Sequence, residues 1–362
     1  MSRLKILAIL CVVSILIGCA SEVNDDERYY QEHSIEDFSV FLSVEENPFL
    51  GRPTAIKASP GGLYIIDSGR YKIHKVDSTG DLQMSFGSLG QGPGEYQTIT
   101  GFWPLGDRYL LYDYNSFKFI TYDLNGDMID EVILTKNPVN PESGRSIPIT
   151  VEALPSGKLL IPTGGSEGSL FAITEPDGGE VIYAGNALDE FVTIYNHEEV
   201  TETYSRGENP GIFKNLVMLG SSSDGIYSLQ QTTGVLEKFT HSGERVWELE
   251  LNIPGQMGLM YQIAQHNIEA GRSNGPTQMF MYALAMDTTE EGVAILLNMP
   301  ENQPTTIAWV PEEGRNVDLI TIESLDPDEL GFMEMFALSA ENRTAYYLER
   351  ETGTVYKFDW PL

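Results

Sequence analysis

Short apolar runs separated by turn residues recur along most of the chain, and two such stretches repeat closely. Residues 63–81 and 109–127 align without a gap and begin 46 residues apart. Each contains an apolar run, an Asp-led turn, an alternating strand and a Gly-Asp turn. Short runs with this alternation predict β-strands, because helical periodicity is nearly absent. The pair therefore indicates two copies of one β-sheet unit.

The same order of elements returns four more times in looser form. We expect six units, over residues of about 56–96, 99–134, 149–188, 213–251, 279–322 and 332–360. A period of roughly 40 to 50 residues with four strands per unit is typical of a β-propeller. The sequence therefore predicts an all-β protein, a six-bladed β-propeller of four-stranded antiparallel blades.

The two ends of the chain predict how the ring closes. The last unit stops at Leu362 and lacks its fourth, outer strand, whereas a spare apolar strand at residues 38–44 precedes the first unit. A completed last blade would leave no open sheet edge at the junction. We expect strand 38–44 to complete the last blade.

The first unit resembles an NHL-type repeat, since Asp67-Ser68-Gly69 and Lys72-Ile73 follow an apolar strand. Residues 86–96, Phe-Gly-Ser-Leu-Gly-Gln-Gly-Pro-Gly-Glu-Tyr, resemble the link between blades in six-bladed propeller lipoproteins of Bacteroidetes-like bacteria. The likeness is close over residues 56–134 and architectural beyond them, and Lys72 stands where an NHL repeat more often has Arg. The resemblance implies a fold and a location rather than a reaction.

The N-terminus has the pattern of an export signal. Two basic residues precede the apolar run 6–17, which is shorter than the roughly 20 residues of a membrane span. Residues 16–19, Leu-Ile-Gly-Cys, resemble the bacterial lipobox. We expect residues 1–18 to be removed, Cys19 to carry a lipid such as palmitate, and residues 19–37 to form an acidic tether. This predicts attachment to a bacterial membrane of the cell envelope, with the outer membrane favoured and periplasmic and surface-facing orientations both open.

Charge and cysteine content narrow the range of partners. The formal net charge is −31, and such a field repels nucleic acid and anionic lipid headgroups. A solubility surface is the simplest explanation of the acid excess. Cys11 lies in the signal, so the mature chain would have no disulfide, thiol nucleophile or Cys-based zinc site. We expect a monomer that does not bind nucleic acid.

Local motifs for metal binding or catalysis are absent from the sequence. Asp67, Asp113 and Glu349 each lead a turn and are predicted to accept hydrogen bonds from backbone N–H groups. The alternative is that some of these acids face the central channel and hold a divalent cation. His74 belongs to a set of five histidines that forms no local metal-binding pair. A propeller can still gather ligands from different blades, so the question of a metal stays open.

Two insertions interrupt the rhythm of the blades, at residues 189–212 and 255–278. Residues 259–268 within the second are predicted to form a short helix. Long ordered loops in compact domains are often functional, although a tolerated surface excursion is the simpler explanation. The candidate ligand-facing residues of these loops are Tyr195, His197, Tyr204, Arg206, Tyr261 and His266.

These observations favour a membrane-anchored exported propeller that acts as a binding module for a protein or a glycan, without a cofactor. No catalytic residue is assigned. The alternative is a metal-dependent lactonase-like hydrolase or lyase with its site in the central channel, a chemistry that related propellers carry out. Its motivation is the acid excess together with His74, His197 and His266, which lie in different blades or links. A structural subunit of an envelope complex is a third possibility.

Overall fold

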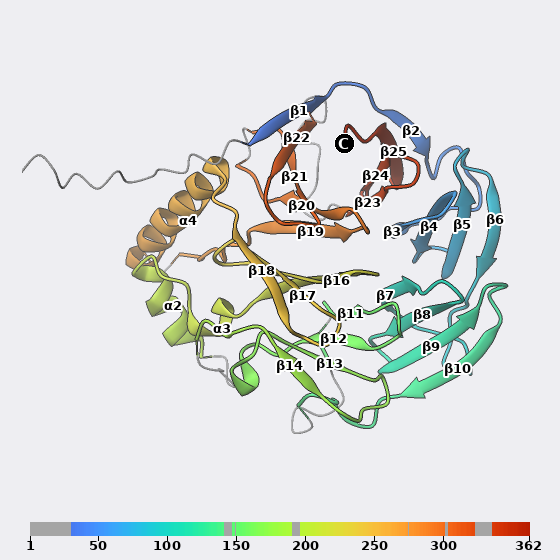
Figure 1. Ribbon diagram of the computed structural model, residues 1–362, viewed down its shortest axis with the longest axis horizontal. Helices are drawn as coiled ribbons and strands as arrows, with labels where there is room; N and C mark the ends of the chain where they lie inside the picture. The colour runs from blue at the N-terminus through green and yellow to red at the C-terminus, as the bar shows by residue number, and fades with distance from the viewer. Residues whose placement is uncertain are drawn as a thin grey trace, which may run out of the picture. The chain divides into compact units, whose positions relative to one another are not determined.

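The computed structural model describes residues 30–140, 147–148, 150–189, 196–273, 275–300, 303–322 and 335–362. Residues 31–362 form one compact unit. Within this unit, six antiparallel sheets stand around a common axis (Figure 1). The predicted six-bladed β-propeller is confirmed.

In blades 1 to 4 the four strands pair in chain order, with the first strand nearest the axis, and blades 5 and 6 share this order except for outer strands from the N-terminal segment (Figure 1). Blade 1 contains β3 (Pro53–Ser59), β4 (Gly62–Asp67), β5 (Lys72–Asp77) and β6 (Leu82–Phe86). Blade 2 contains β7 (Ile99–Pro104), β8 (Arg108–Asp113), β9 (Lys118–Asp123) and β10 (Met128–Ile133). Blade 3 contains β11 (Glu152–Ala153), β12 (Leu159–Pro162), β13 (Phe171–Thr174) and β14 (Ile182–Ala184), with the 3-10 helix η2 (Ser166–Gly168) between β12 and β13.

The second half of the ring follows the same order. Blade 4 contains β15 (Val217–Ser222), β16 (Gly225–Gln230), β17 (Val235–Phe239) and β18 (Arg245–Glu250). Blade 5 contains β19 (Ala283–Thr288), β20 (Gly292–Leu297), β21 (Thr305–Pro311) and β22 (Asp318–Ile322). Blade 6 has three strands from the C-terminal part of the chain, β23 (Met335–Ser339), β24 (Thr344–Glu349) and β25 (Thr354–Asp359).

The fourth strand of blade 6 comes from the N-terminal segment, as the sequence predicts. Strand β2 (Ser39–Leu42) pairs antiparallel with β25, and the register joins Ser39 to Lys357 and Leu42 to Val355. Leu42 is 2% exposed and packs in an apolar cluster that joins blade 6 to blade 1. The closing strand therefore contributes both backbone pairing and a buried side chain.

The N-terminal segment also forms a strand that the sequence analysis misses. Strand β1 (Gln31–Ile35) runs parallel to β22 and adds a fifth strand to blade 5. The expectation that residues 19–37 form a tether is therefore wrong for residues 31–35. The four residues before Ile35 are polar, because this edge strand faces solvent along most of its length. Backbone pairing and the burial of Ile35 hold it in place.

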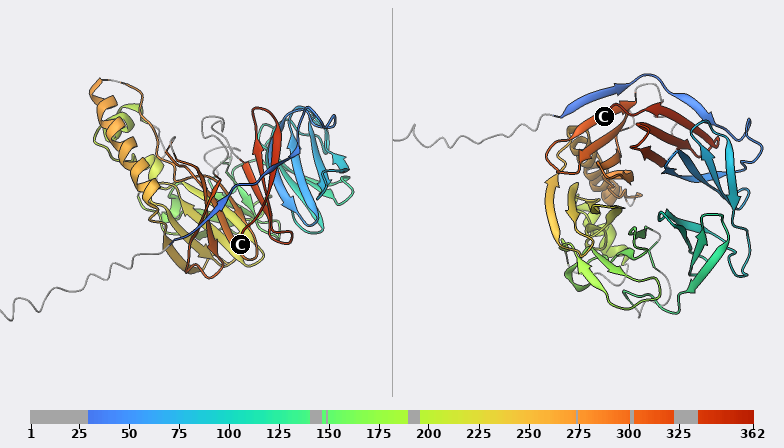
Figure 2. Two further views of the ribbon diagram at one scale, coloured as in Figure 1. Left: turned by 90° about the horizontal axis from the view of Figure 1, so that it is seen from above. Right: turned by 45° about the vertical axis from the view of Figure 1, so that its right-hand side comes forward.

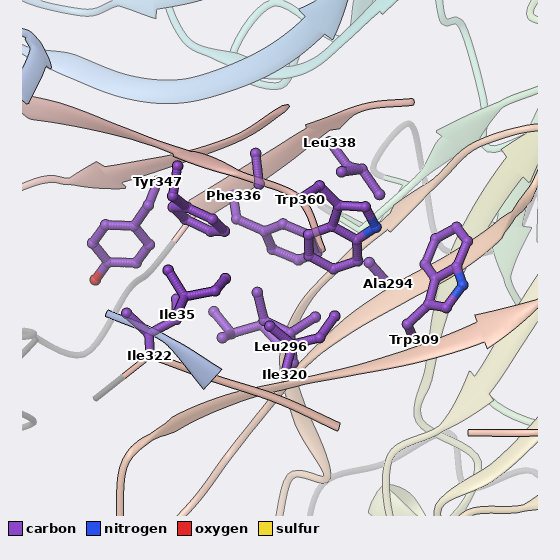
Figure 3. Packing of buried hydrophobic residues seen from close by; sticks show 13 residues of the cluster. Ile35, Ala294, Leu296, Trp309, Ile320, Ile322, Phe336, Leu338, Tyr347 and Trp360 are labelled. Carbon is purple, nitrogen blue, oxygen red and sulfur yellow. The ribbon is translucent and has the colours of Figure 1, made fainter. Parts of the chain in front are cut away.

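The apolar core lies between neighbouring blades. Figure 3 shows one cluster, in which Ile35 of β1 joins side chains of blades 5 and 6. Trp309 of blade 5 and Trp360, which follows β25, meet edge to face with ring centroids 5.8 Å apart. Similar clusters join blades 1 and 2, blades 2 and 3, and blades 3 and 4. Each of these blades therefore depends on its neighbour for burial of an apolar face.

Replacing Leu42 by Ala should lower the free energy of unfolding by about 2 to 4 kcal/mol, because the substitution opens a cavity where blade 6 meets blade 1. Val40, on the same strand, is 54% exposed, and Val40→Ala should change stability by less than about 0.5 kcal/mol. Equilibrium denaturation in urea measures both variants. Equal losses in the two would contradict a sealing role for the Leu42 side chain.

Candidate functional site

One face of the ring gathers the features of interest. In a four-stranded antiparallel blade, the turn between the second and third strands and the link to the next blade lie at the same ends of the strands. We call this surface the link face. Both insertions are links between blades, so both lie on it. Their helices are α2 (His197–Ser205), α3 (Gly211–Lys214) and α4 (Pro254–Ser273).

The helices of the two insertions pack side by side on the link face (Figures 1 and 2). Gly271 of α4 lies against Ser205 of α2 so closely that a Cβ atom at position 271 would collide with the Ser205 side chain. Helix α4 extends well beyond the predicted residues 259–268 at both ends. The insertions therefore form one packed helical unit rather than two independent loops.

The predicted ligand-facing residues fall into different environments. His197, the first residue of α2, and Arg206, directly after α2, are both exposed, and Tyr261 and His266 are exposed on α4. Arg206 lies within 3.2 Å of Glu202 and 3.4 Å of Glu208, and His266 Nε2 lies 3.1 Å from the carbonyl oxygen of Pro276.

Two of the predicted residues need separate mention. Tyr204 is 4% exposed and stacks against Phe213 with ring centroids 6.2 Å apart, so it packs the base of α2 and does not face a ligand. The prediction for Tyr204 is therefore wrong, because a tyrosine in a polar helix is equally suited to anchor that helix. Tyr195 lies outside the described residues.

The turn-leading acids follow the capping prediction in blades 1 and 2. Asp67, which is 1% exposed, accepts hydrogen bonds from four backbone N–H groups, those of residues 51, 52, 69 and 70. Asp113 accepts from the N–H groups of Gln97 and Thr98, both at 2.9 Å. Each carboxylate thereby fixes the link that enters its own blade. Glu349 instead accepts from the hydroxyls of Thr352 and Tyr356, so the backbone-capping prediction is wrong for this residue.

His74 lies inside blade 1 and supports one of these caps. Its Nδ1 lies 2.8 Å from Ser85 Oγ, and its Nε2 lies 3.7 Å from Asp67 Oδ2. Although burial opposes ionisation, the nearby His74 ring and the hydrogen bonds from the backbone lower the pKa of Asp67 to about 2. His197 and His266 lie on the helices of the insertions. Among the residues that the structure describes, no three His, Cys, Asp or Glu side chains are grouped so as to hold a metal ion.

A pocket opens on the link face between blades 2 and 3, with a volume of about 340 Å³. Tyr114, in the turn after β8, forms its first wall. The link from blade 2 to blade 3 contributes the second wall, which includes Asn137 and Val139. The third wall is the turn after β12, which includes Thr163 and Ser166. This volume falls at the lower end of ligand pockets, roughly 300 to 1,000 Å³.

The pocket walls are held by contacts behind them. Asn137 Oδ1 accepts from the N–H groups of Val139 and Asn140 at 2.8 and 2.9 Å, which bends the link back on itself. Thr163 Oγ1 donates to the carbonyl oxygen of Ser169 at 2.5 Å and closes the base of the turn after β12. These hydrogen bonds therefore hold the second and third walls of the pocket in shape.

Asn215 connects this pocket to the first insertion. Its side chain is 1% exposed, and Nδ2 donates to the carbonyl oxygen of Gly164, inside the third wall, at 3.0 Å. Its Oδ1 accepts from the N–H group of Leu188 at 2.8 Å. The loop that carries Ser166 is thus tied to residues 188–189 at the start of insertion 189–212.

A second group of polar side chains comes from the strands nearest the axis. Lys57, Glu152 and Asp287 belong to the first strands of blades 1, 3 and 5. Glu152 Oε1 accepts from the Ala153 N–H group at 3.1 Å, and Asp287 Oδ2 accepts from the Leu338 N–H group of blade 6 at 2.7 Å. The Asp287 hydrogen bond therefore links blade 5 to blade 6.

Electrostatics explains how the ring tolerates these charges. Burial raises the pKa of the Glu152 and Asp287 carboxyl groups, although the Lys57 ammonium opposes that rise. Burial alone would lower the pKa of Lys57, but the two nearby carboxylates outweigh it and raise the pKa. The Lys57 ammonium thus interacts electrostatically with carboxyl groups of two other blades.

Neither the pocket nor the axial group is identified by the sequence reasoning. The pocket residues occupy short links that lack a motif, and the pocket appears only when two blades are placed side by side. The one available signal is the turn-forming run Asn-Pro-Val-Asn at residues 137–140. Lys57, Glu152 and Asp287 lie on the first strands of their blades. The sequence predicts the blades but does not show which face of these strands is directed towards the axis.

Comparison with known proteins supports the fold. Residues 29–140, which contain β1, β2 and the first two blades, match a family model described as a 6-bladed beta-propeller. The family model and the sheets agree. A search of curated proteins gave no match.

Solved structures give a similar result. A Bacteroides fragilis protein described as exported matches with a TM-score of 0.55 and 13% identity, over 91% of this chain and 99% of that one. A Bacteroides vulgatus protein of the duf4221 family matches with a TM-score of 0.48 and 12% identity, over 90% of this chain and 96% of that one. A virginiamycin B lyase from Staphylococcus aureus matches with a TM-score of 0.44 and 12% identity, over 90% of each chain. The first likeness shows a shared fold, and the other two carry no functional argument.

Within the part of the chain that the structure describes, no helix combines the length and the apolar character that crossing a membrane requires.

Replacing Asp67 by Asn should lower the free energy of unfolding at pH 7 by about 2 kcal/mol, because the amide has no charge with which to hold the surrounding N–H groups and His74. The folded pKa of Asp67 lies below its ordinary value of 3.8, so this stability is fully present above about pH 4 and is lost as the pH falls towards 2. Urea denaturation from pH 7 down to pH 2 measures the effect, and the variant should lose part of the acid-induced decline.

Asp77 provides the matched control, because it caps the turn between β5 and β6 of the same blade from a more exposed position. Asp77→Asn should cost less stability than Asp67→Asn, since water replaces the lost contacts. An Asp67→Asn variant whose acid profile matches that of the wild type would refute the assignment.

Proposed function

We propose that the protein is an exported binding module, held at a bacterial cell envelope by a lipid on Cys19, that captures its ligand in the pocket of the link face. The observation that carries the proposal is the pocket itself, a cavity of about 340 Å³ whose walls come from two blades. Lipid attachment rests on the Leu16 to Cys19 motif and the apolar run before it.

The chemistry of the pocket favours binding over catalysis. Among the residues that the structure describes, ten line the pocket, and they include no Asp, Glu, His, Lys or Arg. General acid–base catalysis most often uses a His, Asp, Glu or Lys side chain, and none of the ten described lining residues is of these types. The lining offers hydrogen bonds and apolar contact, which are the requirements of recognition.

The support behind the walls also suits a binding site. The third wall is tied through Asn215 to insertion 189–212, whose helix α2 packs on α4 of the second insertion. Such backing keeps a pocket in its bound shape, and this lowers the conformational cost of binding. On this proposal, the insertions support the pocket and need not touch the ligand.

Filling the pocket tests the site. Val139→Trp places a large side chain among the lining residues, whereas Leu89→Trp adds the same group at a position that is 51% exposed on the link between blades 1 and 2. Thermal unfolding first shows that both variants fold. Immobilised protein lacking residues 1–19 is then exposed to arrays of glycans and peptides, and bound components are titrated. We expect at least tenfold weaker binding for Val139→Trp and unchanged binding for Leu89→Trp. Equal affinities for wild type and Val139→Trp would refute the pocket as the site.

Lipid attachment has a separate test. Expression of the full chain in a bacterium that processes lipoproteins, with labelled palmitate in the medium, should label the wild-type protein and place it in the membrane fraction. Cys19→Ser should abolish the label and release the protein into the soluble fraction, whereas Cys11→Ser, within the expected signal, should leave both unchanged. Labelling of Cys19→Ser at the wild-type level would contradict the assignment.

A further inference from the structure

The pocket between blades 2 and 3 combines two kinds of surface. Its inner part is apolar, since Ile147 and Ile161 are 2% and 1% exposed and Val139 lies beside them. The remaining lining includes amide and hydroxyl groups, from Asn137, Asn140, Thr163 and Ser166. A ligand that fits must therefore present an apolar face together with several hydrogen-bonding groups.

The described part of this lining differs in charge from the rest of the chain. The protein contains 53 acidic and 22 basic residues among 362, yet the ten described residues that line the pocket are all uncharged. A charged ligand would lose its hydration on entering the pocket and would meet no opposite charge among the described lining residues. Desolvation of an unpaired ion costs several kcal/mol. The net charge of −31 adds repulsion against an anion. A neutral ligand fits best.

Tyr114 presents an aromatic ring at this pocket in a fixed position. The ring lies edge to face with that of Tyr112, with centroids 6.4 Å apart and an interplanar angle of 90°, and Tyr112 is fully buried. Phe117 packs against it from the other end of the same turn, at 6.1 Å. Two contacts therefore hold the ring before any ligand arrives, which reduces the entropy that binding must remove.

Two hydroxyl groups in the pocket lining are available to a ligand. Among the described residues, the Tyr114 hydroxyl and Ser166 Oγ have no hydrogen-bond partner, although both residues line the pocket and both are partly exposed. A hydroxyl both donates and accepts hydrogen bonds, so it suits a partner that does the same. Together with the Asn137 and Asn140 side chains, these groups surround the apolar inner part.

Resting on the proposed binding function, we infer that this pocket recognises a neutral carbohydrate, with Tyr114 as the residue that stacks on a sugar ring. A pyranose has an apolar face of C–H groups and an edge of hydroxyls, which matches an aromatic ring and apolar inner surface bordered by amides and hydroxyls. The cavity has room for a mono- or disaccharide. The Ser166 and Tyr114 hydroxyls bind sugar hydroxyls from two different walls of the pocket.

An array of neutral oligosaccharides, acidic polysaccharides and peptides, probed with protein lacking residues 1–19, tests the inference. The wild type should bind one or more neutral oligosaccharides. Tyr114→Ala should weaken that binding at least tenfold through loss of stacking, and Tyr114→Phe and Ser166→Ala should each weaken it about threefold through loss of one hydrogen bond. Tyr261→Ala, on α4 and 66% exposed, provides the matched control and should bind as the wild type does.

Salt dependence adds a second readout. Affinity for a neutral ligand should change less than about twofold between roughly 0.05 and 0.5 M NaCl, because no charge pair is screened. Binding that weakens steeply with salt overturns the inference. Binding of a neutral sugar that Tyr114→Ala does not reduce also overturns it.

The two proposals fail separately. If only acidic polysaccharides or peptides bind, and Val139→Trp blocks them, the carbohydrate inference is overturned while the binding pocket is supported. If a neutral sugar binds equally to the wild type and Val139→Trp, both the inference and the pocket as binding site are overturned. Binding of no array component overturns the inference, because the neutral oligosaccharides are then excluded as ligands.

Discussion

Burial between neighbouring blades is the constraint on which the structure depends. Sheets of four strands have two faces, and in this protein apolar side chains on those faces meet partners in the next blade. A row of such sheets would leave a face uncovered at each end, whereas a ring leaves none. The link face, the pocket and the axial group exist because each blade is held at a fixed angle to the next. The closing strand β2 matters for the same reason, since it completes the blade that meets blade 1.

The sequence is most informative where one residue class recurs with a fixed period. The apolar runs, the Asp-led turns at Asp67 and Asp113 and the missing outer strand of the last unit predict the ring, its blade number and its closure. Strand β1 is not predicted, because pairing to β22 is a backbone property that needs almost no apolar side chains. Helices α2 and α4 are predicted only in part, because such helices draw their stability from packing that the sequence alone does not specify.

The candidate site lies beyond such reasoning for a different reason. Tyr114 and Ser166 are 52 positions apart and become neighbours only because blades 2 and 3 are adjacent and both turns lie on the link face. Spacing along the chain records the length of a blade and says nothing about which side chains converge at its end. The same holds for Lys57, Glu152 and Asp287, where three separate blades supply one electrostatic group. In this propeller, both the pocket and the axial group therefore combine side chains from different blades.

The parallel pairing of β1 has a mechanical consequence. Backbone hydrogen bonds run across the strands, so a pull on the N-terminal end directed along β1 loads all five residue pairs of the β1–β22 ladder at once. This is a shear geometry, in which no single bond opens first. A ladder pulled from the side would instead open one pair at a time. Traction on the chain before Gln31 would thus be resisted by blade 5 before it reached β2. Strand β1 therefore protects the pairing of β2 with β25, which closes the ring, from a pull on the N-terminal end of the chain.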